Sequence, residues 1–168
     1  SVISTYGEVE FSNKEKSISS QNKIEKISNK NYELIQNEED INKWLNEAEE
    51  NGEIAVDTET SSLDPHQAKL IGISFSTKIG KACYIPVGHT KAKNIDETKV
   101  IKKIKPILED KSIKKIGQNI KFDYIILYHR GIKMTSMEDT MLMSYVLDAG
   151  KNRHNMDTLS EIHLDHKT

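Results

Sequence analysis

The 168-residue chain is 36% hydrophobic and 30% charged, which is typical of one globular domain that can bury a sizeable core and also carry a tail. It contains no apolar run of the roughly 20 residues that a membrane span needs, and its first residues lack the apolar segment of a secretory signal. The 24 basic and 26 acidic residues give a net charge of −2, which argues against tight, sequence-independent wrapping of duplex nucleic acid.

The chain contains one cysteine, Cys83, which excludes an internal disulfide framework and any multi-cysteine metal site. We therefore expect an intracellular, reducing compartment, the cytoplasm. Because the sequence begins with Ser rather than Met, we also expect it to be a piece of a longer protein. All but two of the basic residues are lysines, so only Arg130 and Arg153 can make bidentate guanidinium contacts to phosphate.

The first part of the chain reads as a tail. Residues 1–29 are rich in Ser, Lys, Glu and Asn, and their few apolar residues follow no sustained period, so we predict a linker or tail. A short strand near Val2–Phe11 is the alternative. The folded domain is expected over residues 30–168.

An edge strand and a helix are predicted at the start of the domain. Tyr32 and its apolar neighbours favour a short edge strand. Asn37 precedes three acidic residues, a pattern typical of a helix N-terminus capped by the Asn side chain. Apolar residues then recur at helical spacing until Asn51 and Gly52, where we expect the helix to end.

Strands and helices alternate over the rest of the chain. Three apolar runs separated by short polar segments predict an antiparallel meander: Ile54–Val56, Leu70–Phe75 and Ala82–Val87. An amphipathic helix over Val100–Leu108 and a fourth strand over Ile113–Ile116 follow, and then helices over residues 120–128, 140–147 and 156–164. With the edge strand, these elements predict a mixed α/β fold with a five-stranded sheet flanked by helices.

Several side chains are expected to play structural parts. Cys83 lies in a predicted strand, where a buried thiol is the expected state. We interpret four methionines as core filling, namely Met134, Met137, Met141 and Met143. The lysines form a solvated basic face, with a path for DNA as the alternative: Lys99, Lys102, Lys103, Lys105, Lys111, Lys114, Lys115 and Lys121.

Two carboxylates follow the first strand of the meander. Asp57 and Glu59 are two residues apart, so the alternation of side chains along a strand places them on the same side of the sheet. Two acids held together repel unless a proton or cation lies between them, and Mg²⁺ or Mn²⁺ prefers such oxygen ligands. The alternative is a pair of solvated acids at a strand end.

A third carboxylate follows the fourth strand. Gly117 and Gln118 form a turn after this strand, and Asn119 is suited to cap the next helix, whose first turn contains Asp123. Asp123 either favours the helix dipole or joins Asp57 and Glu59 at one edge of the sheet. Three hard ligands at one edge indicate a two-metal phosphoryl-transfer site.

These motifs resemble those of a known family. Asp57-Thr58-Glu59-Thr60, with Ser62-Leu63 behind it, resembles the first motif of the DEDD 3′–5′ exonucleases, and Gly117-Gln118-Asn119-x-Lys121-x-Asp123 resembles the second. Over residues 31–168 the chain is similar to the proofreading domain of bacterial family A DNA polymerases, the polymerase I family. The segments that carry this closer match are Glu138–Leu142, Arg153-His154-x-Met156-Asp157-x-Leu159 and His166-Lys167-Thr168. Ribonuclease D and RecQ-linked exonucleases share the carboxylates but match the later segments less well.

The resemblance implies a ribonuclease-H-like fold and two divalent ions, Mg²⁺ or Mn²⁺, with Zn²⁺ as an option at the tighter site. It implies that Asp57 bridges both ions, that Glu59 binds the tighter one and that Asp123 holds the second. It implies further that Leu63 wedges against the terminal base and that Arg153 contacts a backbone phosphate. The other residues implied to line the substrate cleft are Thr58, Gln118, Asn119 and Phe122.

One part of the family pattern is not found in these 168 residues. The family carries a third motif, Tyr-x-x-x-Asp, some tens of residues beyond the His-Lys-Thr segment, whereas the sequence ends at Thr168. We therefore expect a C-terminally truncated domain with an incomplete site.

The resemblance implies removal of 3′-terminal nucleotides from a single-stranded or frayed DNA end, as the proofreading domain of a polymerase on the same parent chain, without any membrane partner. Two alternatives stay open: a non-catalytic structural or DNA-binding module of the polymerase, and an exoribonuclease of the ribonuclease D type.

Overall fold

The computed structural model describes residues 31–167. The predicted tail, residues 1–29, and its alternative strand at Val2–Phe11 lie outside the described residues. No helix of the described part is long and apolar enough to cross a membrane.

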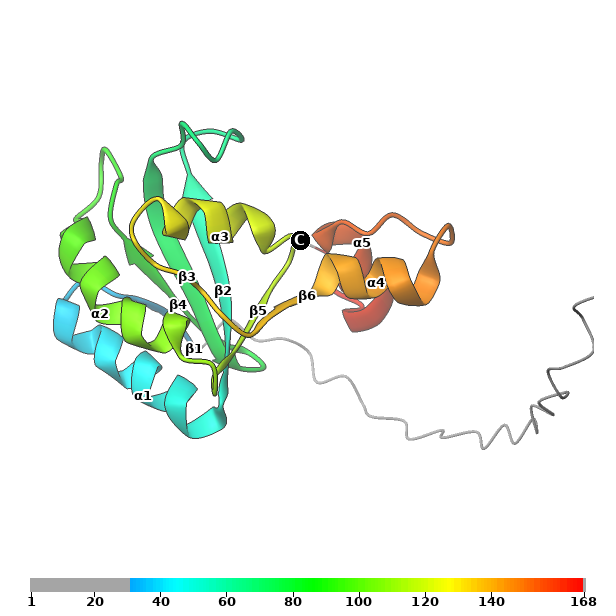
Figure 1. Cartoon of the computed structure of the whole chain (residues 1–168), viewed down its shortest axis with the longest axis horizontal. Helices are drawn as coiled ribbons and strands as arrows, with labels where there is room; N and C mark the ends of the chain where they lie inside the picture. Colours follow the sequence, from blue (N-terminus) through cyan, green and yellow to red (C-terminus); the bar gives the residue numbers. More distant parts are fainter. Residues whose placement is uncertain (1–30, 168) are drawn as a thin grey trace, which may run out of the picture.

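The described residues form one mixed sheet and the helices that flank it (Figure 1). The strands are β1 (Asn31–Leu34), β2 (Glu53–Thr60), β3 (Leu70–Lys78), β4 (Lys81–Pro86), β5 (Lys114–Gly117) and β6 (Met137–Asp139). The helices are the short 3₁₀ helix η1 (Glu38–Asp40), α1 (Ile41–Asn51), α2 (Glu97–Glu109), α3 (Lys121–Tyr128), α4 (Thr140–Asp148) and α5 (Met156–Leu164).

The strand order across the sheet is β1-β4-β3-β2-β5-β6. The pairs β2–β3 and β3–β4 are antiparallel, which confirms the predicted meander, whereas β1, β5 and β6 pair in parallel with β4, β2 and β5. The mixed α/β fold class is therefore confirmed, but the sheet has six strands rather than the predicted five. The additional strand, β6, has only three residues and no apolar alternation, so its pairing with β5 could not be read from its own sequence.

The hydrophobic core lies on one face of the sheet, beneath the first three α-helices. Ile54 and Val56 of β2 alternate with more exposed residues and face this core. Trp44 of α1 is fully buried there, and Lys81 Nζ lies 5.1 Å from the centroid of its ring. The predicted strand thiol, Cys83, is also buried, and burial raises its pKa to about 12, so the thiol stays protonated at neutral pH.

The predicted cap and the predicted start of the first helix are both wrong. Asn37 makes no capping bond: its side chain donates to Asp40 at 3.2 Å, and the α-helix begins only at Ile41, after the short η1 helix. The C-terminal end of α1 is as predicted, because Gly52 adopts a left-handed φ of 70° there.

Lys115 is fully buried rather than solvated, in contrast to the prediction for the basic stretch. Its ammonium group donates to the carbonyl oxygens of Asp110 and Ile113, at 2.5 and 2.6 Å, and thereby fixes the turn that precedes β5. Burial lowers the pKa of Lys115. A lysine at an inward position of a short strand is indistinguishable in sequence from its exposed neighbours.

Glu47 of α1 joins the helix to the β3–β4 hairpin. Its carboxylate accepts a 2.8 Å hydrogen bond from Thr77 and lies 2.5 Å from Lys81 Nζ and 3.2 Å from Lys78 Nζ. The bond from Lys81, then the bond from Thr77, lower the pKa of Glu47 from 4.5 to about 2, against the effect of burial.

Replacing Glu47 is expected to destabilise the fold in a pH-dependent way. Because the pKa is lower in the folded chain, the carboxylate stabilises it above pH 4.5, and this contribution is lost as the pH falls toward 2. We expect Glu47→Gln to lower the free energy of unfolding by about 1 to 2 kcal/mol at pH 7, and to have little effect near pH 2.

Urea unfolding at the two pH values measures this difference. The matched control is Glu33→Gln, which removes a more exposed ion pair with Lys43 and should cost less stability at pH 7. An equal loss of unfolding free energy for Glu47→Gln at both pH values would show that the effect is not electrostatic.

Candidate active site

The candidate site is built on β2, the strand that carries the first two predicted carboxylates. Asp57 is half-buried and Glu59 is exposed, and both lie on the face of β2 opposite the buried Val56 and Thr58. In the register with β3, Asp57 lies beside Ser74 and Glu59 beside Gly72. The prediction that the two acids share one face of the sheet is therefore confirmed.

Asp123 reaches the same strand from α3. Its Oδ1 atom accepts hydrogen bonds from the backbone N–H of Thr58 at 2.8 Å and from the Thr58 hydroxyl at 2.6 Å. The backbone N–H of Thr58 is available because the β2–β5 ladder ends at Ala55 and Ile116, where β5 turns away toward α3. The Asp123 carboxylate thus takes the place that the next residue of β5 would otherwise fill.

The three acids are electrostatic neighbours. Burial, then the charges of Asp123 and Glu59, raise the pKa of Asp57 to about 6. Burial also raises the pKa of Asp123, although the two bonds from Thr58 oppose this. None of these three carboxylates forms an ion pair with a described lysine, arginine or histidine. The site therefore concentrates negative charge without a cation from the described part of the protein.

This donor set fits a hard divalent cation. Both Thr58 bonds go to Oδ1 of Asp123, and no other described residue donates to its Oδ2 atom or to the Asp57 carboxylate. Carboxylate oxygens of this kind are the preferred ligands of Mg²⁺ and Mn²⁺. Among residues 31–167, however, no three acidic, histidine or cysteine side chains already converge as a metal-binding group. The convergence expected from the sequence is thus only partly formed.

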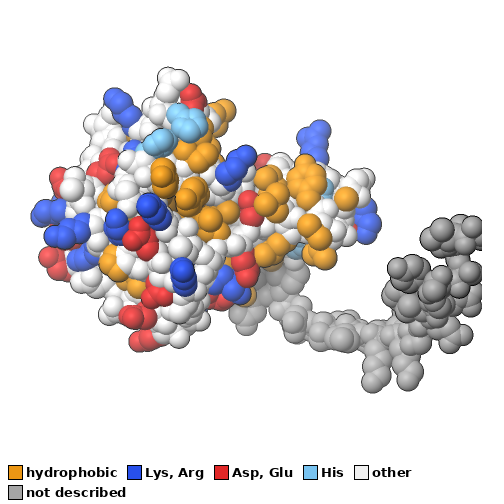
Figure 2. Space-filling model, viewed as in Figure 1, with side chains coloured by type: hydrophobic (Ala, Val, Ile, Leu, Met, Phe, Trp, Pro, Cys, Tyr) orange, Lys and Arg blue, Asp and Glu red, His pale blue; other side chains and the backbone are white. Residues whose placement is uncertain are grey.

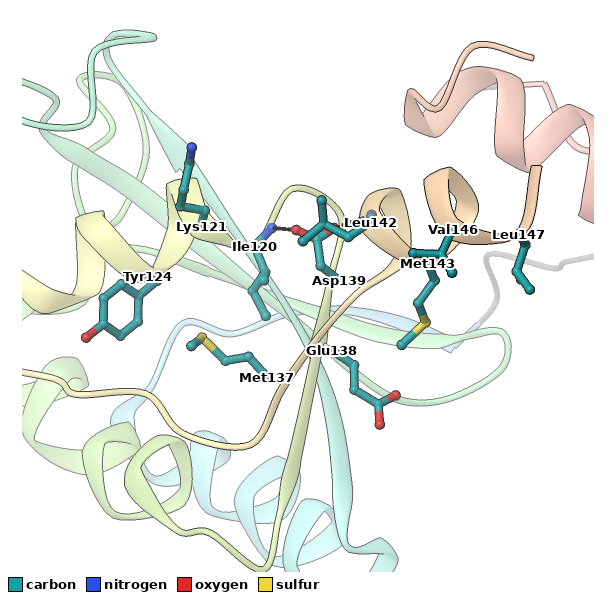
Figure 3. A pocket seen from close by; sticks show the side chains of 10 residues that line it. All are labelled: Ile120, Lys121, Tyr124, Met137, Glu138, Asp139, Leu142, Met143, Val146 and Leu147. Carbon is teal, nitrogen blue, oxygen red and sulfur yellow. Dashed lines mark hydrogen bonds between the residues drawn. The ribbon is translucent and has the colours of Figure 1, made fainter. Parts of the chain in front are cut away.

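Asn119 does not cap α3, in contrast to the prediction. Its backbone is left-handed, with φ of 56°, and the cap comes from another element. Asp139 at the end of β6 accepts bonds from the N–H groups of Asn119 and Ile120 at 3.0 and 3.1 Å, and also from Met141 in α4 at 2.9 Å. One carboxylate therefore fixes the start of both helices, as the bond to Ile120 in Figure 3 illustrates.

An apolar pocket of about 670 Å³ lies beside this cap, between α3, β6 and α4 (Figure 3). Its lining includes Met137 and Met143, which are 42% and 43% exposed, so the prediction that they fill the core is wrong; Met134 alone of the four is buried. Figure 2 shows hydrophobic side chains gathered over this part of the molecule and charged side chains over α1 and α2.

The residues that resemblance assigned to the substrate lie in different environments. Leu63 is 95% exposed on the loop between β2 and β3. Phe122 is half-buried and packs against the core, whereas Arg153 is exposed in the segment between α4 and α5 and makes no polar contact with another described residue. Thr58 is buried, and its hydroxyl is held by Asp123.

Gln118, which the resemblance also places in the substrate cleft, makes two hydrogen bonds within the fold. Its side-chain N–H donates to the carbonyl oxygen of His154 at 2.7 Å, and its oxygen accepts from the Thr140 hydroxyl at 2.5 Å. It therefore ties the end of β5 to α4 and to the segment before α5. The cavity behind it, about 740 Å³, is lined by Asp57, by small side chains of the sheet and by residues of α4 and α5.

Sequence reasoning missed Tyr84. This half-buried tyrosine of β4 lies beside Ser74, one strand further from Asp57, and its hydroxyl group leans over Gly72, where a Cβ atom would meet it at 2.0 Å. Burial and the charge of Glu59 raise the pKa of Tyr84, and its hydroxyl lies 2.7 Å from His89 Nε2. The alternation of side chains along the strands could have identified it, because it places Tyr84 on the same face of the sheet as Asp57.

Comparison with protein families gives a match over most of the chain. A family model described as 3′–5′ exonuclease matches residues 32–168. The DNA polymerase I of Rhizobium leguminosarum is 38% identical over 156 residues, and that of Pseudomonas aeruginosa is 38% identical over 147 residues. These alignments span 80% and 82% of the chain but only 15% and 16% of the relatives' own length.

Solved structures share the fold. NrnC of Brucella melitensis with bound Mg²⁺ superimposes with a TM-score of 0.60 at 24% identity, covering 82% of this chain and 62% of that one. The ribonuclease D of Trypanosoma brucei in complex with RNA U12 gives a TM-score of 0.66 at 14% identity, covering 82% and 48%.

Proposed function

The chain belongs to the 3′–5′ exonuclease family, and on this premise we propose that it hydrolyses the 3′-terminal nucleotides of DNA as the proofreading domain of a DNA polymerase. One observation carries the proposal: Asp57, Glu59 and Asp123 form a cluster of carboxylates without a basic partner among the described residues, at the end of a central strand. Such a cluster is unfavourable until cations and a phosphodiester neutralise it.

Asp57, Glu59 and Asp123 would hold two divalent ions, Mg²⁺ or Mn²⁺, with Zn²⁺ as an option at the tighter site. When bound, such ions supply Lewis acidity toward the scissile phosphate and the attacking water. Thr58 keeps the Asp123 carboxylate in place through its two bonds to Oδ1, which leaves Oδ2 without a donor from another described residue. The protein's own part is therefore positioning and charge complementarity.

The substrate would be gripped from both sides of the carboxylates. Leu63 would wedge against the terminal base, and Arg153 would contact a backbone phosphate. Phe122 and the backbone around Asn119 and Gln118 would line the same cleft. The partners are a single-stranded or frayed 3′ end and a polymerase domain on the same parent chain, and the expected cytoplasmic location stays a prediction.

The test is nucleotide release by the full-length protein. We expect Mg²⁺- or Mn²⁺-dependent release of mononucleotides from 3′-labelled single-stranded DNA, and loss of release when EDTA removes the metal. Matched RNA and DNA oligonucleotides distinguish the exoribonuclease alternative, which requires faster release from RNA. DNA binding without any release would support the non-catalytic module instead.

Leu63→Ala is expected to weaken substrate binding without affecting the fold. The loop that carries Leu63 is closed by its own bonds, including Lys69 N–H to Ser61 Oγ at 2.9 Å and Asp64 N–H to Ser62 Oγ at 3.1 Å. Because Leu63 packs on nothing, its truncation should leave the melting temperature unchanged. Loss of its contact with a base should raise KM about tenfold.

Ile79→Ala is the matched control. Ile79 is 93% exposed in the β3–β4 turn, at the opposite end of the sheet, so its truncation should leave KM unchanged. An unchanged KM for Leu63→Ala would show that Leu63 does not touch the substrate.

A further inference from the structure

The two arginines of the chain differ in their partners. Arg130 is bound within the fold, because its guanidinium contacts Glu97 at 2.6 Å and the carbonyl oxygen of Ile126 at 2.8 Å. Arg153 is exposed and makes no polar contact with any other described residue. It is therefore the one arginine of the chain whose planar donor set is open to a phosphate.

The side chain of His154, the residue after Arg153, is held in place by its neighbours. His154 is buried, and its Nδ1 atom lies 2.7 Å from the Ser144 hydroxyl on α4. Its ring lies against Tyr145, with 3.9 Å between the ring centroids and 35° between the planes. A buried imidazole held in this way fixes the backbone of the residue before it.

A second set of contacts joins His154 to the catalytic strands. Gln118 donates to the His154 carbonyl oxygen at 2.7 Å and accepts from Thr140, as described above. Gln118 follows Gly117, the last residue of β5, which is the strand beside β2. Side chains of α4 and α5 line a cavity of about 740 Å³ against this face of the sheet, so polar contacts rather than dense packing set their place.

We propose that His154 is a positioning residue that holds Arg153 toward the phosphate backbone of the substrate. The inference rests on the proposed exonuclease function. The hydrogen bond with Ser144 fixes the imidazole, and the bond from Gln118 fixes the carbonyl group of the same residue. Together they keep the backbone of Arg153 at a set distance from the end of β5, whereas its side chain stays free for a phosphate.

Two substitutions of His154 separate the hydrogen bond from the ring. His154→Asn places an amide group where Nδ1 lies and keeps a partner for Ser144, whereas His154→Gln places it where Nε2 lies and loses that partner. Both substitutions remove the ring that lies on Tyr145. A difference in KM between the two variants therefore measures the effect of the hydrogen bond to Ser144. Ser144→Ala removes the same bond from the other side and serves if His154→Gln fails to fold.

The measurement is KM for single-stranded DNA in the full-length protein at several salt concentrations. Loss of one phosphate contact should reduce the slope of log KM against log salt by about 0.7 and raise KM about tenfold. We expect this result for Arg153→Ala, for His154→Gln and for Ser144→Ala, whereas His154→Asn keeps the slope of the unaltered protein. The double variant Arg153→Ala/His154→Gln should match Arg153→Ala alone, because both act on one contact.

A slope unchanged in both His154→Gln and Ser144→Ala, or additive effects in the double variant, would overturn the inference while leaving the exonuclease function intact. A lower fraction of folded protein alters the rate at every salt concentration alike and leaves the slope unchanged, so a purely structural role is excluded by the slope. If the unaltered protein releases no nucleotide from DNA or RNA, the proposed function fails, and the inference fails with it.

Discussion

Asp57→Ala should abolish metal-dependent nucleotide release, with a loss of about 10³-fold or more in rate. Burial, and then the charges of Asp123 and Glu59, raise the pKa of Asp57 to about 6. It is thus the carboxylate that shares its surroundings with both others. Removing it takes away the ligand that the resemblance assigns to both ions.

The same position should show a gain in stability. Because burial and two like charges disfavour the ionised carboxylate, we expect Asp57→Asn to raise the free energy of unfolding by about 1 to 3 kcal/mol at pH 7 without metal. Loss of activity together with a gain in stability indicates a group retained for chemistry rather than for folding.

Glu53→Gln is the control for both measurements. Glu53 begins the same strand and lies on the same face, but it is exposed and lies at the other end of the strand. This variant should keep both the rate and the stability of the unaltered protein. Release by a folded Asp57→Ala variant would contradict the assignment of the site.

Thr58→Val is expected to have the second-largest effect, through the position of Asp123. The substitution keeps the size and the β-branched shape of the buried side chain but removes the 2.6 Å bond from its hydroxyl to Asp123 Oδ1. Because that bond lowers the pKa of Asp123, its loss should raise this pKa further. Partners of this kind orient metal ligands, and their removal commonly reduces metal affinity about 10- to 100-fold.

Calorimetric titration with Mn²⁺ measures this loss of metal affinity. Thr58→Ser keeps the hydroxyl and should restore most of the affinity. The matched control is Thr77→Val, which removes a similarly buried hydroxyl that donates to Glu47 of α1 and not to Asp123. Thr77→Val should reduce stability and leave Mn²⁺ binding unchanged. Equal weakening by both variants would argue against a role for Thr58 in holding Asp123.

Much of the fold follows from local patterns. The helix over 156–164 and the antiparallel meander were predicted because apolar periodicity and turn residues are local signals. β6 was missed because three residues without apolar alternation become a strand only when β5 supplies the partner. Lys115 was misplaced for a related reason, since its burial depends on which side of β5 faces the core.

The candidate site also has some features that follow from local sequence and others that depend on tertiary contacts. The placement of Asp57 and Glu59 on one face of a strand follows from local pattern, because side chains alternate along any strand, and the spacing of the motifs indicates the family. Contacts between separate elements decide that Thr58 holds Asp123, that Asp139 of β6 caps α3, and that Gln118 supports His154 rather than lying free. Each of these contacts joins residues 19 to 65 positions apart, and a hydrogen bond depends on the meeting of two elements in space, which no local pattern encodes.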